Sequence, residues 1–222
     1  EAQSRRWFDD PVCTLLNGVG LCDGQTVATR DGFGVENGSQ LLATPEEVDA
    51  VVAHLQSLAV DSPPDPDVGA KVRRIEDQLL STYAGALIGN QALDFGKQDG
   101  VTEMAEAVQA NVVERRLNDA LLEAEKRGEV RIPRGVAFVG CVSNFGNFLD
   151  LFRKTIRNLE ASVPVVVLSR SNTTQHNFRW AQILVHEMRE KQVDARMLTF
   201  LSAGIDDQCR VMDALAATSP MY

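Results

Sequence analysis

The chain has 222 residues, of which 44% are hydrophobic and 24% are charged, and this composition is typical of a folded globular protein. The formal net charge of -9 argues against a nucleic-acid-binding protein, which would need a basic face. The longest apolar run, at 163–168, is far shorter than the roughly 18 residues of a membrane span, so we expect no membrane-spanning segment.

The cysteines and histidines do not predict a metal site. None of the four cysteines belongs to a C-x-x-C pair, and only three histidines are present. Cys141 and Cys209 lie in apolar segments and are expected to be buried. A Cys13–Cys22 disulfide would need an oxidising compartment, and nothing in the sequence favours it. We therefore expect a soluble protein from a reducing compartment, either cytoplasmic or organellar. An organellar location would follow processing of a targeting segment, since the chain begins with Glu1 rather than Met.

Residues 1–43 are predicted to form a turn-rich segment, because six glycines interrupt short apolar pieces. The stretch 32–38 is similar to a dinucleotide-binding fingerprint, but its third glycine comes one residue late and no long helix follows. We interpret Asn37-Gly38 as a turn instead.

Residues 44–130 are predicted to be a helical region that packs on the following domain. The first helix begins at Thr44 with Pro45 in its first position and Glu47 placed to complete a capping box, and the prolines at 62–66 end it. Two longer helices follow over 68–93 and 101–127. The second carries an apolar series of six residues: Met104, Val108, Val112, Leu117, Leu121 and Leu122. The arginine pairs at 73–74 and 115–116 are interpreted as solvated helix faces.

Residues 131–222 alternate between apolar strands and single helices. Strands are predicted at 136–142, 163–168 and 196–201, and helices at 144–161, 173–191 and 206–217. Strands joined by single helices predict right-handed crossovers and a parallel sheet, hence an α/β, Rossmann-like fold that binds ligands at the carboxyl ends of its strands. Met221-Tyr222 is similar to the start of a fourth strand, which leaves the predicted sheet incomplete.

Several short motifs in this order resemble the aldehyde dehydrogenase superfamily. After the first predicted strand the chain reads Val142-Ser143-Asn144-Phe145-Gly146, at the place of that family's turn before a helix. The second strand is followed by the polar loop 168–174, and the segments 43–49, 93–97 and 132–136 are similar to the family's pattern at corresponding places. The resemblance covers about residues 40–222 and is densest after 131.

The resemblance implies a nicotinamide cofactor and a substrate aldehyde. It places Asn144 at the family's oxyanion-hole asparagine, whose amide stabilises developing negative charge. The alternative is that Asn144 only caps the following helix, as asparagine often does. The candidate cofactor-binding residues are Ser143, Ser169, Arg170, Ser171 and Gly204.

The polar loop departs from the family's pattern. Leu168 stands where the family has a lysine, and Ser171 where it often has a glutamate, so two charge-assisted hydrogen bonds of about 1.5–3 kcal/mol each are lost. Without the glutamate, Arg170 with Ser169 and Ser171 could receive the 2′-phosphate of NADP. The alternative is that Arg170 is a solvated loop residue. Three alternatives therefore stay open: the chain binds NADP, it binds NAD, or it binds no cofactor.

Three functional hypotheses follow from the resemblance. The family's catalytic cysteine belongs to a later domain, no cysteine of this chain matches it, and 128–132 leaves no room for the oligomerisation hairpin of typical members. The chain could be the NAD(P)-binding half of an oxidoreductase that oxidises an aldehyde, with its own catalytic half or protein partners beside it. It could be a non-catalytic structural or assembly subunit of a larger complex. It could also be a regulatory domain that binds a nucleotide.

Overall fold

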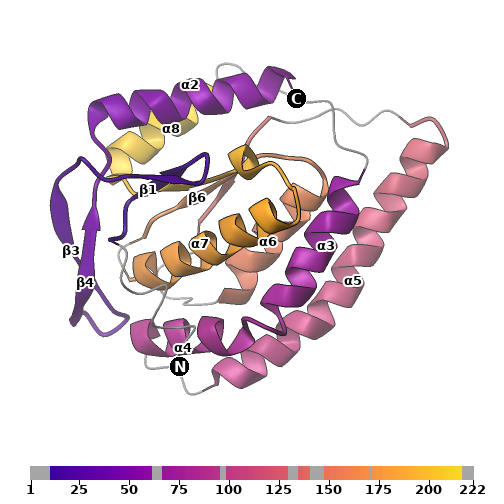
Figure 1. The fold of residues 1–222 in the computed structure, drawn as a ribbon, viewed down its shortest axis with the longest axis horizontal. Helices are drawn as coiled ribbons and strands as arrows, with labels where there is room; N and C mark the ends of the chain where they lie inside the picture. Colours follow the sequence, from indigo (N-terminus) through magenta and orange to yellow (C-terminus); the bar gives the residue numbers. More distant parts are fainter. Residues whose placement is uncertain are drawn as a thin grey trace.

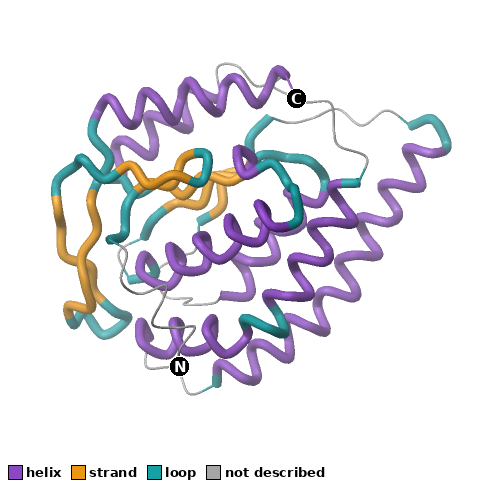
Figure 2. The backbone as a smooth tube through the Cα atoms, in the orientation of Figure 1, coloured by secondary structure: helices purple, strands orange, loops and turns teal. Residues whose placement is uncertain are grey.

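The computed structural model describes residues 11–61, 67–95, 99–129, 135–140, 148–170 and 172–216. Helices surround a five-stranded sheet, and a separate two-stranded hairpin lies at one side (Figures 1 and 2). The strands of the main sheet are in the order β2-β1-β7-β6-β5. Their bounds are Thr14–Leu16 (β1), Val19–Leu21 (β2), Ala137–Val139 (β5), Val165–Leu168 (β6) and Leu198–Leu201 (β7).

The three predicted strands lie side by side and point the same way, which confirms the α/β Rossmann-like prediction. Val139 pairs with Val167, and Leu168 pairs with Leu201, both in parallel ladders. The strands are shorter than predicted. At 195–197 the chain instead forms a 3₁₀ turn, where the Asp194 carboxylate accepts a hydrogen bond from the Arg196 N–H at 2.9 Å.

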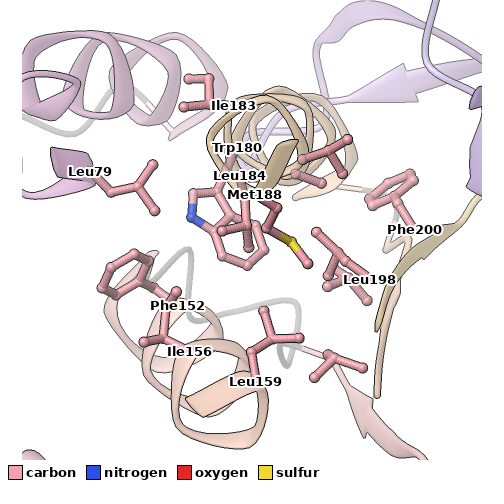
Figure 3. Close-up of a cluster of buried hydrophobic side chains, with 14 of the residues drawn as sticks. Leu79, Phe152, Ile156, Leu159, Trp180, Ile183, Leu184, Met188, Leu198 and Phe200 are labelled. Atoms are coloured by element: carbon pink, nitrogen blue, oxygen red, sulfur yellow. The ribbon is translucent and has the colours of Figure 1, made fainter. Parts of the chain in front are cut away.

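Both faces of the parallel sheet are covered, because alternate side chains of each strand point to opposite sides. Val165 and Val167 pack with α6 (Phe148–Glu160) and α7 (Thr174–Glu190) in the larger core. Val166 and Leu168 pack in a second core beneath α2 (Pro45–Asp61) and α8 (Ile205–Ala216). Figure 3 shows the centre of the larger core. The largest fully buried side chains include Trp180, Phe152, Phe178, Phe200, Ile156, Leu159, Ile183, Leu184 and Met188.

The amino-terminal segment contains strands as well as turns. β1 and β2 form a hairpin that adds to the main sheet, with β1 antiparallel to β7. Cys13 and Cys22 form a disulfide across this hairpin, with a Cα–Cα distance of 5.3 Å. The sequence did not favour this pair, because the hairpin that brings the two residues together depends on β7, far along the chain.

The interpretation of Asn37-Gly38 as a turn is wrong. β3 (Thr26–Arg30) and β4 (Glu36–Leu41) form the second hairpin, and Gly38 lies inside β4 opposite Thr29. The turn comes earlier, because the Asp31 carboxylate accepts hydrogen bonds from the N–H groups of Phe33 and Val35. A Cβ on Gly38 would lie 2.7 Å from the side-chain nitrogen of Gln175, so close approach by α7 explains the glycine.

The predicted capping box at the start of α2 is present: the Glu47 N–H donates to the Thr44 hydroxyl at 3.2 Å, and the Thr44 N–H donates to the Glu47 carboxylate at 2.8 Å. The single helix predicted over 68–93 is two helices, α3 (Val68–Leu79) and α4 (Ala84–Phe95), separated by a turn at 80–83. In the described part of the chain, no helix is both long enough and apolar enough to cross a bilayer.

The apolar series of the next helix does not face the protein interior. α5 (Gly100–Lys126) packs against α3, α4 and α6. Of the six apolar residues in the predicted series, only Met104 is buried, and the other five are exposed. Arg73 and Arg115 are partly buried in ion pairs rather than solvated, although Arg74 and Arg116 are exposed as predicted. The physical reason is that α5 contacts α3 and α6 largely through charged and polar side chains.

Cys209 is exposed on α8, contrary to its predicted burial. The buried positions on this helix are Gln208, Val211 and Leu215, so the cysteine lies on the outer side. Its apolar neighbours in the sequence did not reveal the direction in which it points. The other cysteine predicted to be buried, Cys141, lies outside the described residues.

Candidate functional site

The candidate site lies where the three parallel strands end at one edge of the sheet. Gly140 follows β5, Ser169 and Arg170 follow β6, and Gly204 opens α8 after β7. The parallel registers of β5 with β6 and of β6 with β7 align these ends. The structure therefore brings together the described residues that the sequence predicted to bind a cofactor. Ser143, Asn144 and Ser171 lie outside the described residues, so their roles remain predictions.

Ser169 is buried and joins the ends of two strands. Its N–H donates to the Leu201 carbonyl at 3.0 Å, and its hydroxyl oxygen accepts from the Ala203 N–H at 3.3 Å. The side-chain amide of Gln208 donates to the Ser169 carbonyl at 3.0 Å and to the Ala203 carbonyl at 2.8 Å. Ser169 therefore has a structural role within the edge, whatever a ligand adds to it.

Gln208 is a site residue that sequence reasoning missed. It is buried in the first turns of α8, and its backbone N–H donates to the Gly204 carbonyl at 3.0 Å. The signal in the sequence was its position four residues after Gly204, from which a side chain points back toward the start of its helix. Gln208 connects the ends of β6 and β7, because its side-chain amide donates to the carbonyls of Ser169 and Ala203.

Arg170 is an exposed cation at this edge. Its backbone carbonyl accepts hydrogen bonds from the Thr173 N–H at 2.9 Å and from the hydroxyl groups of Thr173 and Thr174, which fixes the loop at the start of α7. Its side chain crosses the end of β5, where its Nε lies 3.9 Å from the position that a Cβ on Gly140 would occupy. The loop therefore holds the Arg170 guanidinium group near the end of β5.

Gly204 has open space around it at the end of β7, one strand beyond Arg170. A Cβ at Gly204 would meet no atom within 4 Å, and the neighbouring Ile205 is 68% exposed. Asp206 and Asp207 already place two carboxylates in the first turn of α8. The favourable field of that helix terminus for an anion is thereby offset, so Arg170 is the group of this edge that would attract a phosphate.

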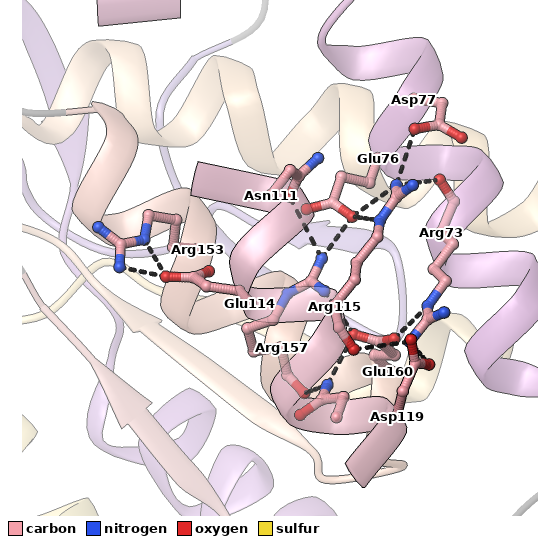
Figure 4. A network of polar contacts seen from close by, with 11 residues as sticks. Arg73, Glu76, Asp77, Asn111, Glu114, Arg115, Asp119, Arg153, Arg157 and Glu160 are labelled. Atoms are coloured by element: carbon pink, nitrogen blue, oxygen red, sulfur yellow. Dashed lines mark hydrogen bonds and ion pairs between the residues drawn. The ribbon is translucent and has the colours of Figure 1, made fainter. Parts of the chain in front are cut away.

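A network of charged side chains joins α3, α5 and α6 (Figure 4). Glu76 of α3 is fully buried, and its carboxylate accepts hydrogen bonds from Arg115 Nε at 2.9 Å and pairs with Arg157 of α6. Burial raises the pKa of Glu76, and the two guanidinium groups oppose that rise. Because α3, α5 and α6 supply these groups and leave no room between them, the cluster holds the helices together.

A cavity of about 420 Å³ also lies away from the strand ends, between the β1–β2 hairpin and α7. The Cys13–Cys22 disulfide, Gln182 and His186 line it, and Arg189 closes one side by donating to the Gly18 carbonyl at 2.9 Å. It contains none of the predicted site residues.

The parallel strands β5, β6 and β7, with helices on both faces, define an α/β fold. More specifically, the chain has the fold of the aldehyde dehydrogenase superfamily. The sequence itself matches no family model and no curated protein.

Three solved structures illustrate the similarity. An oxidoreductase from Marinobacter aquaeolei is 15% identical, with a TM-score of 0.73 over 92% of this chain and 44% of its own. The NADP-dependent glyceraldehyde-3-phosphate dehydrogenase from Bacillus halodurans C-125, complexed with NADP, is 15% identical, with a TM-score of 0.68 over 93% and 46%. The Delta-pyrroline-5-carboxylate dehydrogenase from Mycobacterium tuberculosis is 15% identical, with a TM-score of 0.67 over 95% and 41%. The chain thus spans less than half the length of these structures.

Proposed function

We propose that this chain is the NADP-binding half of an aldehyde dehydrogenase-like oxidoreductase. The observation on which the proposal rests is the exposed cation Arg170 at the carboxyl ends of three parallel strands, where its Nε lies 3.9 Å from the Cβ position of Gly140. A nicotinamide cofactor supplies hydride acceptance when it is bound; the residues described here would only hold its adenosine end.

The residues fit the 2′-phosphate of NADP better than the ribose hydroxyls of NAD. Arg170 is a cation without a carboxylate beside it in the described part of the loop, so a phosphate there would gain a charge-assisted hydrogen bond. Leu168 is buried and aliphatic and offers the ribose no polar contact, and the hydroxyl of Ser169 already accepts a hydrogen bond from Ala203. The structures of similar fold include one complexed with NADP and one bound with NAD, so the preference rests on the residues of this chain alone.

Calorimetric titration of the protein with NADP and with NAD tests the proposal. We expect NADP to bind more tightly, and Arg170→Ala to weaken NADP binding about 10- to 100-fold, as loss of a charge-assisted hydrogen bond implies, while NAD binding changes little. Arg196→Ala is the matched control, because Arg196 precedes β7 and so lies at the opposite edge of the sheet. Equal absence of binding by both cofactors would contradict the proposal.

A second candidate function is that of a non-catalytic structural or assembly subunit of a larger complex. It is favoured by the edge itself, where Gln208 and Ser169 use their polar groups on one another and Leu168 replaces a cation. Native mass spectrometry of the protein purified from its source separates the two functions. Association with a different protein, together with no response to either cofactor, would favour the subunit.

A further inference from the structure

The long helix α5 is oriented opposite to an ordinary amphipathic surface helix. Its inward side consists mainly of polar and charged residues, such as Asn111, Arg115 and Asn118, which bind charged partners on α3 and α6. Large apolar side chains lie on its outward side: Val113 is 59% exposed, and Leu117 is 64% exposed. Figure 1 shows α5 along the outer border of the molecule, with α3 on its inner side. An apolar outward face of this kind marks an interaction surface.

Five apolar residues that include Val113 and Leu117 form one stripe along the helix, which we call the α5 stripe; Val101, Val108 and Val112 are exposed on another side of the helix. Its members are Ala110, Val113, Leu117, Leu121 and Ala124. Their spacings are three, four, four and three residues, which keeps them on one side of an α-helix over about 21 Å at about 1.5 Å per residue. Leu121 is 54% exposed, so the stripe continues outward beyond Leu117.

We propose that the α5 stripe is the contact by which two copies of this chain form a two-fold symmetric dimer, with the two α5 helices antiparallel and crossing at Leu117. The spacing of the stripe reads the same from either end. An antiparallel pair centred on Leu117 therefore places Val113 opposite Leu121 of the second copy, and Ala110 opposite Ala124. Small residues meet small ones at the ends and large residues meet large ones at the centre, as a self-complementary two-fold interface requires.

The charges beyond the stripe fit the same arrangement. Glu106 lies 11 residues before Leu117, and Arg127 lies 10 residues after it, so each Glu106 would face Arg127 of the second copy. Both residues are exposed in the single chain. Arg127 contacts the exposed carboxylate of Glu129 at 3.5 Å, and its own side chain is 66% exposed. Opposite charges at both ends favour the antiparallel over the parallel orientation, in which like residues would meet.

The size of the stripe predicts a weak dimer. One stripe of five side chains, two of them alanine, belongs to the class of interfaces that bury less than about 1,200 Å² in total. Association is therefore expected to depend on protein concentration, and it is a property of helix α5, independent of whether a cofactor binds at the strand ends.

Sedimentation equilibrium over a wide range of protein concentration is the first test. The wild-type protein should move from 24.3 kDa toward twice that mass, and Leu117→Glu, which places two carboxylates on the symmetry axis, should weaken dimerisation at least 10-fold. Val101→Glu is the matched control, because Val101 is 70% exposed on another side of α5. Both variants should keep the wild-type far-UV circular dichroism, since both side chains are exposed. A wild-type protein that stays monomeric throughout would overturn the proposal.

Cysteine cross-linking tests the register, in a Cys209→Ser background that removes the exposed thiol. Leu117→Cys should form a covalent dimer under mild oxidation. Val113→Cys and Leu121→Cys should cross-link to each other when mixed but poorly to themselves, because two copies of either residue would be eight helical residues apart, about 12 Å, beyond disulfide reach. Efficient self-cross-linking of Val113→Cys would overturn the antiparallel arrangement.

Charge exchange tests the ends of the contact. Glu106→Arg alone and Arg127→Glu alone should each weaken dimerisation, and the double exchange should restore most of it. Additive weakening in the double variant would contradict the proposed pairing.

Discussion

The two interfaces of α6 are built in opposite ways. Against α7 and the sheet, α6 presents apolar side chains: Phe152 meets Trp180 edge to face at a centroid distance of 6.2 Å (Figure 3). Against α5 and the adjoining side of α3 it presents charges: Arg157 and Glu160 join the network around Glu76 (Figure 4). Apolar contact gains free energy from removal of surface from water, whereas the buried charges must first lose their hydration. The comparison predicts that the apolar interface stabilises the fold and that the charged one mainly fixes where α5 lies.

The largest effect is expected in the apolar interface. Trp180→Ala should lower the free energy of unfolding by about 3–5 kcal/mol, because it removes a fully buried aromatic side chain and leaves a cavity. Urea denaturation followed by far-UV circular dichroism measures the loss. Trp180→Phe is the control and should lose less. A loss in Trp180→Ala below about 1 kcal/mol would remove the distinction between the two interfaces.

Removing one partner from the charged interface should lower the free energy of unfolding by about 3 kcal/mol. Glu76→Leu leaves two guanidinium groups short of a buried counter-charge, which is more damaging than absence of the whole pair. The double variant Glu76→Leu with Arg115→Leu should therefore be no less stable than Glu76→Leu alone, as measured by the same denaturation. Losses that simply add would show that Glu76 and Arg115 are not energetically coupled, contrary to this expectation.

The pH dependence of stability that Glu76 causes is a further test of the charged interface. Its pKa in the folded protein is raised above the ordinary value of 4.5, so the folded state holds the proton more tightly than the unfolded state. Stability from this group is therefore greatest at low pH and falls as the pH rises from about 4.5 through the folded pKa. Relative to Glu76→Gln, the wild-type protein should lose stability over that rise, as measured by denaturation at successive pH values. The opposite slope would show that the guanidinium groups outweigh burial.

The smallest effect is expected at an exposed ion pair. Asp194 pairs with Arg196 at 2.7 Å, and this contact lowers the pKa of Asp194 below 3.8. Its stabilisation is present above pH 3.8 and is lost as the pH falls through the lower folded value. Asp194→Asn should cost less than about 1 kcal/mol at neutral pH, since solvent screens the pair. A larger loss, or one unchanged at pH 2–3, would show that the 3₁₀ cap matters more than the charge.

The strands and most helices of the carboxyl-terminal part could be predicted from the sequence, because continuous apolar runs such as 163–168 have few alternative structures. The capping box at Thr44 was equally clear, since both partners are three residues apart. The two short hairpins were not predictable, because their strands are stabilised by β7 and by Gln175 of α7, both more than 100 residues away.

The candidate site could be predicted only in part. Arg170 and Gly204 follow from the alternation of strands and helices, which places strand ends together at one edge. Gln208 could not be found in this way, because its role depends on the gap between two strands that only the folded sheet defines.

What the sequence by itself determined is the parallel arrangement of β5, β6 and β7, because single helices between buried strands allow one handedness of connection. What only the tertiary structure decided is the orientation of α5. Its apolar residues and its charged residues each predict a possible inner side, and the buried carboxylates of Glu76 and Glu160 favour the charged one. A buried carboxylate requires a counter-charge, whereas an exposed leucine such as Leu117 can remain at the surface, where a second copy can cover it.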